Sequence, residues 1–472
     1  MRVCLVCEGG YPYATGGVSS WVQMLCSHTP DVEFVIWSTA TTREDMSEYK
    51  CELPPNVKEV KTIYLGEEQS KHNYKDIHIS EREKKVLRKF ISADAETFSW
   101  KSMLDFLKKN RKRLIDVLMS KGFYEICLEE YLKTASTEVF SQYLQSFRDL
   151  YFSLLNPLSG EFPQADVYHA LSTGYAGVLA SAASYAKKKP MILSEHGIYT
   201  REREEEIIRA TWIKEEFKEL WINFFKKLSM ISYGQASLVT TLFENNKALQ
   251  AELGCPESKI QVIPNGVDIK EFSDLENKHH LTEDAFHIGA ILRVVPVKDV
   301  KTMLFAFDQV LESLPKAHLW IMGGFDEEPA YYEDCVRLIE TLNISNVTFL
   351  GQVDVKEYLP EMDLLVLSSI SEGQPLGMLE GMAAGKPFVC TNVGDCKGLL
   401  EGKVGDELGR AGYVVPVMDS KAMADTILHC AKDKDKLSQM GKVAQKRVET
   451  HYRSEEFLNR YKSIYALYGG NK

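Results

Sequence analysis

The chain has 472 residues, of which 44% are hydrophobic and 26% charged, and its formal net charge at pH 7 is -11. This composition excludes a wholly disordered chain, because disorder needs low hydrophobicity together with a large charge imbalance. At about 150 residues per domain, the length predicts two or three domains. No run approaches the roughly 18 apolar residues of a membrane-spanning helix. The acidic charge also disfavours a nucleic acid as partner, since proteins that bind one usually carry a basic surface.

The first residues and the cysteines predict a cytoplasmic protein. The apolar stretch at residues 1–7 is too short for a secretory signal and lacks a small-residue cleavage site, so we interpret it as a buried first strand. The ten cysteines are spread along the chain without a clustered framework. Such usage is typical of a reducing compartment.

Residues 81–122 carry a charge opposite to that of the whole chain. They contain 12 lysines and arginines against 6 aspartates and glutamates, which gives this segment a net charge of +6. A solvated helical face is the simpler interpretation. Contact with the inner face of a membrane, or with an acidic partner, is the alternative.

The first half of the chain alternates between strand and helix patterns, which predicts a parallel sheet with helices on both faces. An amphipathic stretch at residues 18–26 predicts the first helix, and residues 81–155 are helical without any strand signal. We interpret this longer region as a helical insertion into the first domain. The expected strands of this half are residues 2–7, 33–37, 167–170, 190–193 and 236–241.

After a turn-rich segment at residues 263–268 and a polar stretch up to residue 284, the alternation restarts and predicts a second doubly wound unit. Helices are expected at residues 299–313 and 331–342. The expected strands are residues 287–292, 318–322, 347–350, 363–367 and 387–391. The resulting division is an N-terminal domain at 1–275, a C-terminal domain at 276–453 and a final helix at 454–472 that packs back on the first domain.

The loop and helix that follow the apolar strand ending at Leu367 are the most informative part of the chain. A helix is expected to open near Pro375, because proline suits a first turn, and its free N–H groups and dipole predict an anion site. Glu380 would lie about 7 Å further along this helix. Together with Glu372 in the loop, it could bracket a sugar diphosphate. Glu372 is a candidate catalytic residue, and the candidate donor-binding residues here are Gly373, Gln374, Pro375, Leu376 and Glu380.

Two cations follow the first strand of the second half. Arg293 comes directly after that strand, and Lys298 precedes the next helix, where the helix dipole disfavours a positive charge. A cation at this place is reasonable if an anion binds beside it. Arginine offers a bidentate fork and lysine a point charge, so the two residues suit a leaving diphosphate.

Glycines and one histidine at strand ends complete the set of candidates. Gly16 and Gly17 follow the first strand, and Gly323 follows the strand at residues 318–322, where each allows the backbone to approach a ligand closely. The G-x-G-x-x-G fingerprint of dinucleotide binding is missing, which disfavours a dehydrogenase. His196, beside Gly197 at a strand end, could bind a ligand hydroxyl, and a purely structural histidine is equally open.

We predict no metal site. The Asp-x-Asp sequence at residues 433–435 lies in a lysine-rich and aspartate-rich run on an expected surface helix, whereas a metal-dependent nucleotide-sugar site needs such acids at a strand end.

Arg293 with Lys298, and Glu372 with Glu380, resemble the donor site of the GT-B glycosyltransferases of family 4. The N-terminal stretch from Glu8 to Trp21 and the stretch at 195–203 are similar, more particularly, to the cytosolic glycosyltransferases of Pel exopolysaccharide synthesis, the PelF group. The resemblance implies two Rossmann-like domains facing a central cleft, with the helical insertion in the first.

This resemblance also implies a retaining, metal-independent hexosyltransferase that needs no cofactor and uses a UDP-sugar, UDP-glucose or a related hexose donor. Arg293 and Lys298 would neutralise the diphosphate, Glu380 would hold the ribose, and Glu372 with the backbone of residues 373–376 would hold the sugar. Gly17 would approach the phosphates, and His196 would contact the donor sugar. The acceptor would be a growing saccharide or a lipid-linked one, and a membrane-bound polysaccharide synthase complex is the expected partner.

Two alternatives remain open from the sequence. A nucleotide-sugar epimerase of the same fold would convert a UDP-sugar without an acceptor. A non-catalytic subunit of a membrane synthase would bind the sugar nucleotide without turnover and would use the basic insertion as its docking surface.

Overall fold

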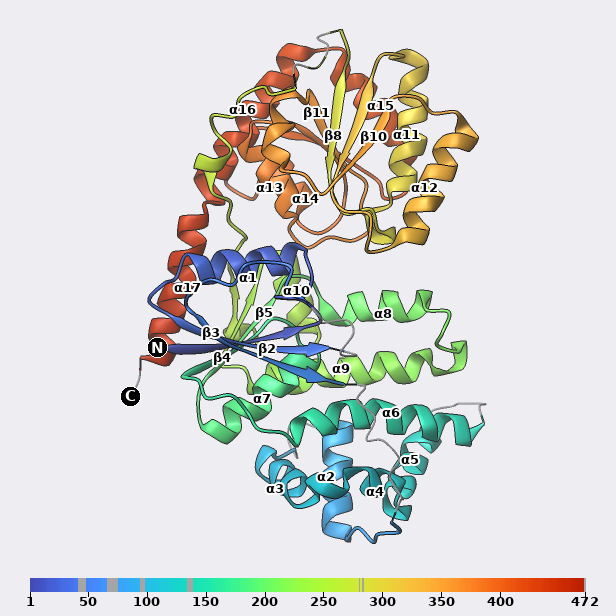
Figure 1. Ribbon diagram of the computed structural model, residues 1–472, viewed down its shortest axis with the longest axis vertical. Helices are drawn as coiled ribbons and strands as arrows, with labels where there is room; N and C mark the ends of the chain where they lie inside the picture. The colour runs from blue at the N-terminus through green and yellow to red at the C-terminus, as the bar shows by residue number, and fades with distance from the viewer. Residues whose placement is uncertain are drawn as a thin grey trace. The chain divides into compact units, whose positions relative to one another are not determined.

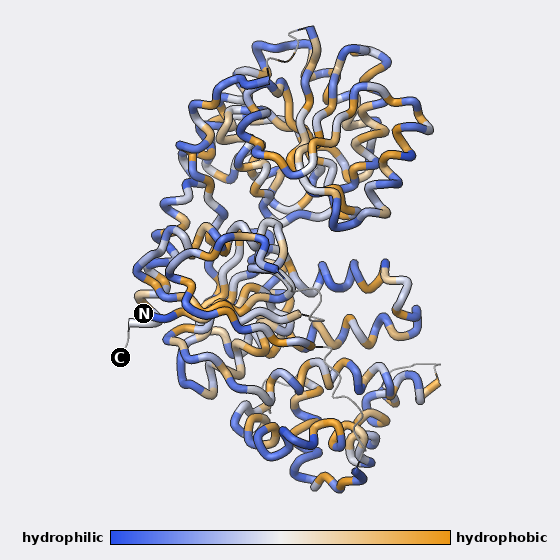
Figure 2. The backbone as a smooth tube through the Cα atoms, viewed as in Figure 1, coloured by the Kyte–Doolittle hydropathy of each residue, from blue (hydrophilic) through white to orange (hydrophobic). Residues whose placement is uncertain are grey.

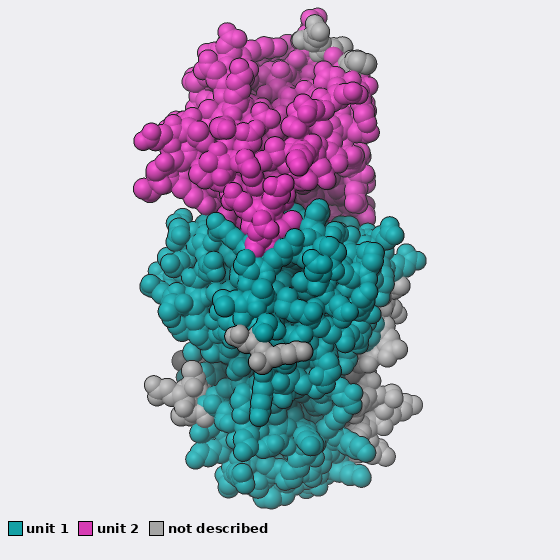
Figure 3. All heavy atoms as spheres, turned by 90° about the vertical axis from the view of Figure 1, so that its left-hand side faces the viewer, with its two compact units in different colours: residues 1–263, 460–472 teal, residues 264–459 magenta. Residues whose placement is uncertain are grey.

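The computed structural model describes residues 1–40, 48–65, 75–93, 98–133, 139–279, 281 and 284–470. The chain divides into two compact units, coloured separately in Figure 3. Unit 1 comprises Met1–Ile263 and Arg460–Lys472, and unit 2 comprises Pro264–Asn459. Each unit is built around its own parallel sheet with helices on its faces (Figure 1).

The division at residues 263 and 264 lies twelve residues before the boundary expected at 275. The reason is a contact between segments far apart in the sequence. The N–H of Val267 donates to the carbonyl of Tyr452 at 2.9 Å, and the N–H of Ser454 donates to the carbonyl of Val267 at 3.0 Å. Gly266 makes room for this approach, because a Cβ there would lie 2.6 Å from the Cα of Ser454. The polar stretch after residue 263 therefore belongs to unit 2.

The sheet of unit 1 has seven parallel strands in the order β3-β2-β1-β4-β5-β6-β7. The order reverses direction between β1 and β4, and the carboxyl ends of strands at such a switch point form the usual ligand-binding place of a doubly wound sheet. The strands are β1 (Arg2–Glu8), β2 (Glu33–Ala40), β3 (Val57–Tyr64), β4 (Val167–Ala170), β5 (Met191–Glu195), β6 (Leu238–Thr241) and β7 (Ile260–Val262).

Helix α7 lies against the sheet of unit 1 and is buried over almost its whole length. Its sequence is rich in alanine and serine, and these small side chains let it pack between the sheet and neighbouring helices. Gly177 shows how close this packing is, since a Cβ there would lie 2.4 Å from the Oγ of Ser232. The helices around this sheet are α1 (Gly17–Ser27), α7 (Tyr175–Lys187), α8 (Tyr199–Arg209), α9 (Lys218–Gln235), α10 (Glu244–Glu252) and α17 (Ser454–Gly469).

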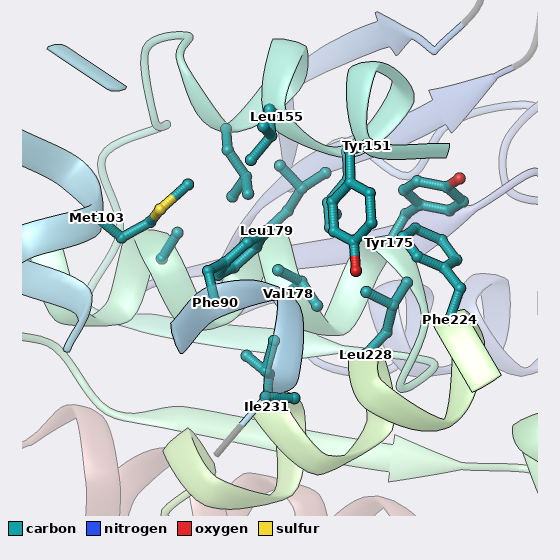
Figure 4. Close-up of a cluster of buried hydrophobic side chains, with 14 of the residues drawn as sticks. Phe90, Met103, Tyr151, Leu155, Tyr175, Val178, Leu179, Phe224, Leu228 and Ile231 are labelled. Carbon is teal, nitrogen blue, oxygen red and sulfur yellow. The ribbon is translucent and has the colours of Figure 1, made fainter. Parts of the chain in front are cut away.

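The helical insertion expected in unit 1 is present, and it shares a core with the helices of the sheet. Figure 4 shows Phe90 and Met103 from the insertion beside Leu179 of α7 and Ile231 of α9, all of them buried in one hydrophobic cluster. The insertion is therefore an extension of unit 1 and not a separate core. Its helices are α2 (Glu81–Ser92), α3 (Trp100–Asn110), α4 (Leu114–Met119), α5 (Lys121–Lys133) and α6 (Phe140–Leu158).

Part of the positive charge of residues 81–122 is balanced by acids just outside that segment. Lys84 pairs with Glu125 at 2.6 Å, and Arg88 binds both carboxylate oxygens of Glu129 at 2.7 Å. Both glutamates lie on α5. The exposed charge of the insertion is consequently smaller than the +6 that the segment alone suggests.

The sheet of unit 2 has six parallel strands in the order β10-β9-β8-β11-β12-β13, with its switch point between β8 and β11. The strands are β8 (His287–Ile291), β9 (His318–Met322), β10 (Val347–Gly351), β11 (Leu364–Leu367), β12 (Phe388–Thr391) and β13 (Gly412–Val415). The helices are α11 (Val300–Ser313), α12 (Pro329–Leu342), α13 (Leu376–Ala383), α14 (Cys396–Glu401), α15 (Ser420–Ala431) and α16 (Lys434–His451).

Central strands of both sheets are continuous apolar runs, as expected where helices cover both faces. Figure 2 shows apolar residues concentrated in the strands, while the outer helices alternate between apolar and polar positions. Strand β11, for example, is buried at all four positions. Among the described helices, none combines the length and the apolar character needed to cross a membrane.

Candidate functional site

The switch point of unit 2 brings Lys298 and Glu372 together. Lys298 follows β8, Glu372 follows β11, and the Nζ of Lys298 lies 2.5 Å from the Oε1 of Glu372. The hydroxyl of Ser369 donates to the same Oε1 at 2.5 Å. The side chain of Lys298 is 18% exposed and that of Glu372 9% exposed. The result is a largely buried ion pair at the place where a doubly wound sheet binds its ligand.

The two loops that carry this pair are hydrogen-bonded to each other. The hydroxyl of Ser368 donates to the carbonyls of Lys298 at 2.8 Å and of Asp299 at 3.0 Å. The N–H of Ile370 donates to the carbonyl of Val297 at 2.9 Å. Because these bonds join the two loops directly, they help to hold Lys298 in place relative to Glu372.

Helix α13 begins beside this pair and presents unused backbone donors. Pro375 precedes it, no side chain caps it, and the first N–H groups of a helix have no partner within the helix. Its second residue, Gly377, lies against the end of β8, since a Cβ there would be 2.8 Å from Ile291 Cγ2. The start of α13 is thus an anion-binding feature at the switch point.

Glu380 is the fifth residue of α13 and is partly buried. Burial, together with the nearby negative charge of Glu271, raises the pKa of its carboxyl above the ordinary value. Within the described part of the chain this carboxylate forms no hydrogen bond or ion pair. It is therefore available to accept hydrogen bonds from ligand hydroxyls.

The side chain of Gln374 is hydrogen-bonded to two other loops of unit 2. Its Nε2 donates to Oδ2 of Asp395 at 2.7 Å, and its Oε1 accepts from the N–H of Asn265 at 2.7 Å. The residue is only 4% exposed. Asp395 also donates its N–H to the carbonyl of Gly373 at 2.9 Å. The amide of Gln374 is thus occupied in holding the loop that carries Glu372 and Gly373.

Arg293 forms an ion pair with Glu327, not with Glu372. Its loop is held against the next strand end, because the N–H of Leu292 donates to the carbonyl of Met322 at 3.0 Å. Gly323 is needed at this contact. It has a φ of +151°, and a Cβ there would lie 1.9 Å from the carbonyl oxygen of Leu292.

In unit 1, His196 lies at the carboxyl end of β5 with its ring edge-on to Trp21, at a centroid distance of 4.9 Å. Burial lowers the pKa of His196 to about 4, so the ring is neutral at neutral pH. Its Nε2 is shielded from solvent and has no hydrogen-bond partner among the described residues. Gly16 and Gly17 open helix α1, which carries Trp21, and the space at the Cβ position of Gly17 is open.

Sequence reasoning missed two contributors to these sites. Ser369, which binds Glu372, is the second residue after β11, and that position near the strand end was the available signal. Glu8 ends β1 and accepts from the hydroxyls of Tyr199 at 2.5 Å and Ser172 at 3.0 Å. Gly174 makes room for this group, because a Cβ there would lie 2.2 Å from the Tyr199 hydroxyl. A strand-terminal glutamate before two glycines was the signal for Glu8.

Two parallel sheets of seven and six strands, each with polar groups gathered at a switch point, define the GT-B fold. Residues 1–258 match the family described as "Domain of unknown function (DUF3492)", and residues 284–433 match the family described as "Glycosyl transferases group 1". The chain belongs to the DUF3492 family, and its second part is similar to the group 1 glycosyl transferases.

Curated relatives include glycosyltransferases of bacterial glycoconjugate synthesis. The N-acetyl-alpha-D-glucosaminyl L-malate synthase of Bacillus anthracis is 28% identical over 246 residues, which is 50% of this chain and 62% of the relative. The capsular polysaccharide biosynthesis glycosyltransferase CapM of Staphylococcus aureus is 24% identical over 62% of this chain and 74% of its own length. The match thus spans less than two thirds of the length of the first relative and about three quarters of the second.

Solved structures of the same fold cover nearly the whole chain. Anabaena HepE in complex with UDP superposes with a TM-score of 0.61 at 14% identity, over 99% of this chain and 100% of HepE. The sucrose-phosphate synthase of Thermosynechococcus elongatus gives a TM-score of 0.62 at 15% identity, over 99% and 98% of the two chains. At these identities, the likeness shows the fold.

Proposed function

We propose that this chain is a retaining glycosyltransferase that moves a hexose from a UDP-sugar, UDP-glucose or a closely related donor, to a growing exopolysaccharide or a lipid-linked acceptor. The observation that carries the proposal is the buried Lys298–Glu372 pair beside the free start of α13, at the switch point of unit 2. The match to group 1 glycosyl transferases covers these same residues and supports it.

In this proposal the diphosphate of the donor lies at the start of α13. The helix N–H groups and the ammonium of Lys298 stabilise the negative charge that develops on the leaving group, which is the largest contribution a site of this type makes to catalysis. Arg293, which pairs with the exposed Glu327, adds a second cation by exchanging that partner for phosphate. As the diphosphate takes over Lys298, Glu372 is released to accept hydrogen bonds from the sugar, and Glu380 accepts those of the ribose.

The reaction needs no protein nucleophile and no metal. The bond between the anomeric carbon and the diphosphate breaks with its electron pair going to the phosphate oxygen. The acceptor hydroxyl attacks on the face that the diphosphate leaves, and a phosphate oxygen takes its proton. Positioning and charge stabilisation then supply the acceleration. We assign to unit 1 a role in binding sugar hydroxyls through neutral His196, with backbone approach at Gly16 and Gly17.

A finer proposal is that the product is a Pel-type polysaccharide, made together with a membrane-bound synthase complex at the inner face of the membrane. The motifs from Glu8 to Trp21 and at 195–203 support this assignment by their resemblance to the PelF group. In the structure, residues of both motifs meet, since Glu8 binds Tyr199 and Trp21 contacts His196.

The deciding experiment is a screen of nucleotide sugars with the full chain, with UDP release as the readout and NMR of any product. We expect UDP release with UDP-glucose or a related donor, an axial product linkage that retains the donor configuration, and activity that survives EDTA. Conversion of the UDP-sugar without UDP release would instead indicate an epimerase. Binding by calorimetry without turnover, even with partners present, would indicate a non-catalytic subunit.

A further inference from the structure

Unit 2 contains a cavity of about 330 Å³ that is separate from the site at Lys298. One wall is formed at the amino ends of two strands, where Asp363 precedes β11 and Pro387 precedes β12. The other wall is the face of α16 that carries Ser438. All strands of this sheet run parallel. The cavity therefore lies at the amino ends of the strands, whereas Glu372 lies at their carboxyl ends, after β11.

Three lysines line this cavity against one aspartate. Lys386 is held in place, since its Nζ donates to the carbonyls of Pro360 at 2.8 Å and of Met362 at 2.9 Å. Because carbonyl groups are neutral, they do not compensate the positive charge of Lys386, and the neighbouring Asp363 compensates it only in part. Asp363 in turn accepts a hydrogen bond from the N–H of His287 at 2.8 Å. The wall at the strand ends therefore holds one fixed cation, Lys386, next to one acid, Asp363.

Lys434 and Lys442 supply the other two cations from α16. They and Ser438 lie at intervals of four residues, so they share one face of the helix. Within the part of the chain that the structure describes, neither lysine takes part in an ion pair. By contrast, Lys446 on the next turn pairs with Glu449 at 3.4 Å and does not line the cavity.

The position of Lys434 is unfavourable unless an anion binds near it. Lys434 is the first residue of α16, where the positive end of the helix dipole repels a cation. Asp433, which caps the helix by accepting from the N–H of Lys436 at 2.9 Å, relieves part of this repulsion. An anion in the cavity would interact favourably with the dipole, with Lys434 and with Lys442 at the same time.

The size and chemistry of the cavity select a small ligand. Its volume is at the lower end of the range of small-molecule sites, about 300 to 1,000 Å³, and does not suit a polymer. Ammonium groups and a hydroxyl match the several acceptor oxygens of a phosphate, which lysine binds as a point charge. Gly385, just after the end of α13, also lines the cavity. Helix α13, which is about 12 Å long, therefore lies between its own start and this cavity.

We propose that this cavity is a binding site for a small phosphorylated molecule, held by Lys434, Lys442 and Ser438 and separate from the sugar-nucleotide site. The site is built by the unpaired, exposed lysines of α16, the fixed ammonium of Lys386 and the partly open hollow between them. Its existence does not depend on the function proposed above.

The test is a calorimetric titration of pyrophosphate into the full chain, with and without saturating UDP. We expect one pyrophosphate to bind per chain in the presence of UDP. The double variant Lys434→Ala/Lys442→Ala should bind it about tenfold more weakly or worse, because two charge-assisted contacts are lost. The matched variant Lys446→Ala, on the same helix, should bind it as the unmodified chain does.

A second measurement uses the unmodified chain, so that it does not depend on how the variants fold. Pyrophosphate should protect Lys434 and Lys442 from acetylation, detected by mass spectrometry, and should leave Lys446 unprotected. Absence of saturable binding at millimolar pyrophosphate, or equal affinity in the double variant, would overturn the proposal. Binding that is lost with UDP or in Lys298→Ala, and kept in the double variant, would overturn it by placing pyrophosphate in the sugar-nucleotide site.

Discussion

Lys298 and Glu372 illustrate how a single pair can serve two states of a site. A buried ion pair contributes little net stability, because the cost of removing both charges from water offsets their attraction. Removing one partner leaves the other charge buried without compensation. If the proposed function holds, a donor diphosphate and sugar hydroxyls would replace this pairing, so that both charged groups of the largely buried pair keep partners.

The first prediction concerns Lys298. In Lys298→Ala we expect kcat for UDP release to fall by about 10² to 10³, since one preorganised charge at the leaving group is lost. Lys301→Ala is the matched control, because Lys301 also lies near the start of α11 but pairs with Asp334 at a more exposed position. Circular dichroism of both variants checks the fold. Equal rates in Lys298→Ala and the control would contradict the proposed role.

The second prediction concerns Gly323. A methyl group there would lie 1.9 Å from the carbonyl oxygen of Leu292, and the φ of +151° is strained for any residue with a Cβ. We expect Gly323→Ala to lower the free energy of unfolding by about 1 to 3 kcal/mol, measured by urea denaturation. Gly324→Ala is the control, since its nearest neighbour is the flexible side chain of Asp326 at 3.1 Å. A loss no greater than that of the control would refute the steric argument.

At the scale of elements, the sequence patterns predicted the central strands well and missed β3, β7 and β13. All three are edge strands of their sheets. Their burial is interrupted, as in β3, where two successive positions are exposed, so they lack the continuous apolar run that marks a strand covered on both faces. In the same way, the strand-end positions of Lys298 and Glu372 could be predicted, whereas the pairing of Gln374 with Asp395 could not, because it joins two loops through side chains.

The third prediction concerns helix α17 and its anchor on His169. The Nδ1 of His169 contacts the hydroxyl of Tyr465 and its Nε2 contacts that of Ser194, both at 2.7 Å. Burial lowers the pKa of His169 to about 3, whereas an unfolded chain has a histidine pKa of about 6.5. Above about pH 6.5 both states are neutral. As the pH falls from there toward 3, only the unfolded state gains the proton, so stability is lost at about 1.4 kcal/mol per pH unit.

Urea denaturation at about pH 7.5 and about pH 5 measures this effect. His169→Gln is expected to be less stable at both values, and its loss between them should be smaller than that of the unmodified chain by about 2 kcal/mol. His28→Gln, a change at an exposed position just after α1, should leave the loss unchanged. An unaltered pH dependence in His169→Gln would show that His169 is not the group responsible.

At the scale of the whole molecule, two hydrophobic clusters that share no residue in the described parts of the chain support the two units. Two doubly wound units could be predicted because each repeats the alternation of strand and helix. Their boundary could not, since it depends on the bridge between Val267 and Arg453, two residues far apart in the sequence. Local sequence patterns carry no signal for such a contact. The boundary between the units was therefore expected at residue 275, whereas it lies between residues 263 and 264.

The separation of the cores leads to the fourth prediction. A ligand that binds the folded state only stabilises it by RT ln(1 + [L]/Kd), about 2.7 kcal/mol at a hundred times Kd. If UDP binds at Lys298 and the start of α13, this stabilisation falls on unit 2.

Hydrogen exchange measures it. Amides of β8 and β11 that exchange only when unit 2 unfolds should then exchange up to about 100-fold more slowly. Amides of β4 and β5 in unit 1 should keep their rates. In Lys298→Ala the protection at the same UDP concentration should be largely lost. Equal slowing in β4 and β5 would instead mean that the two units unfold together or that UDP also binds unit 1.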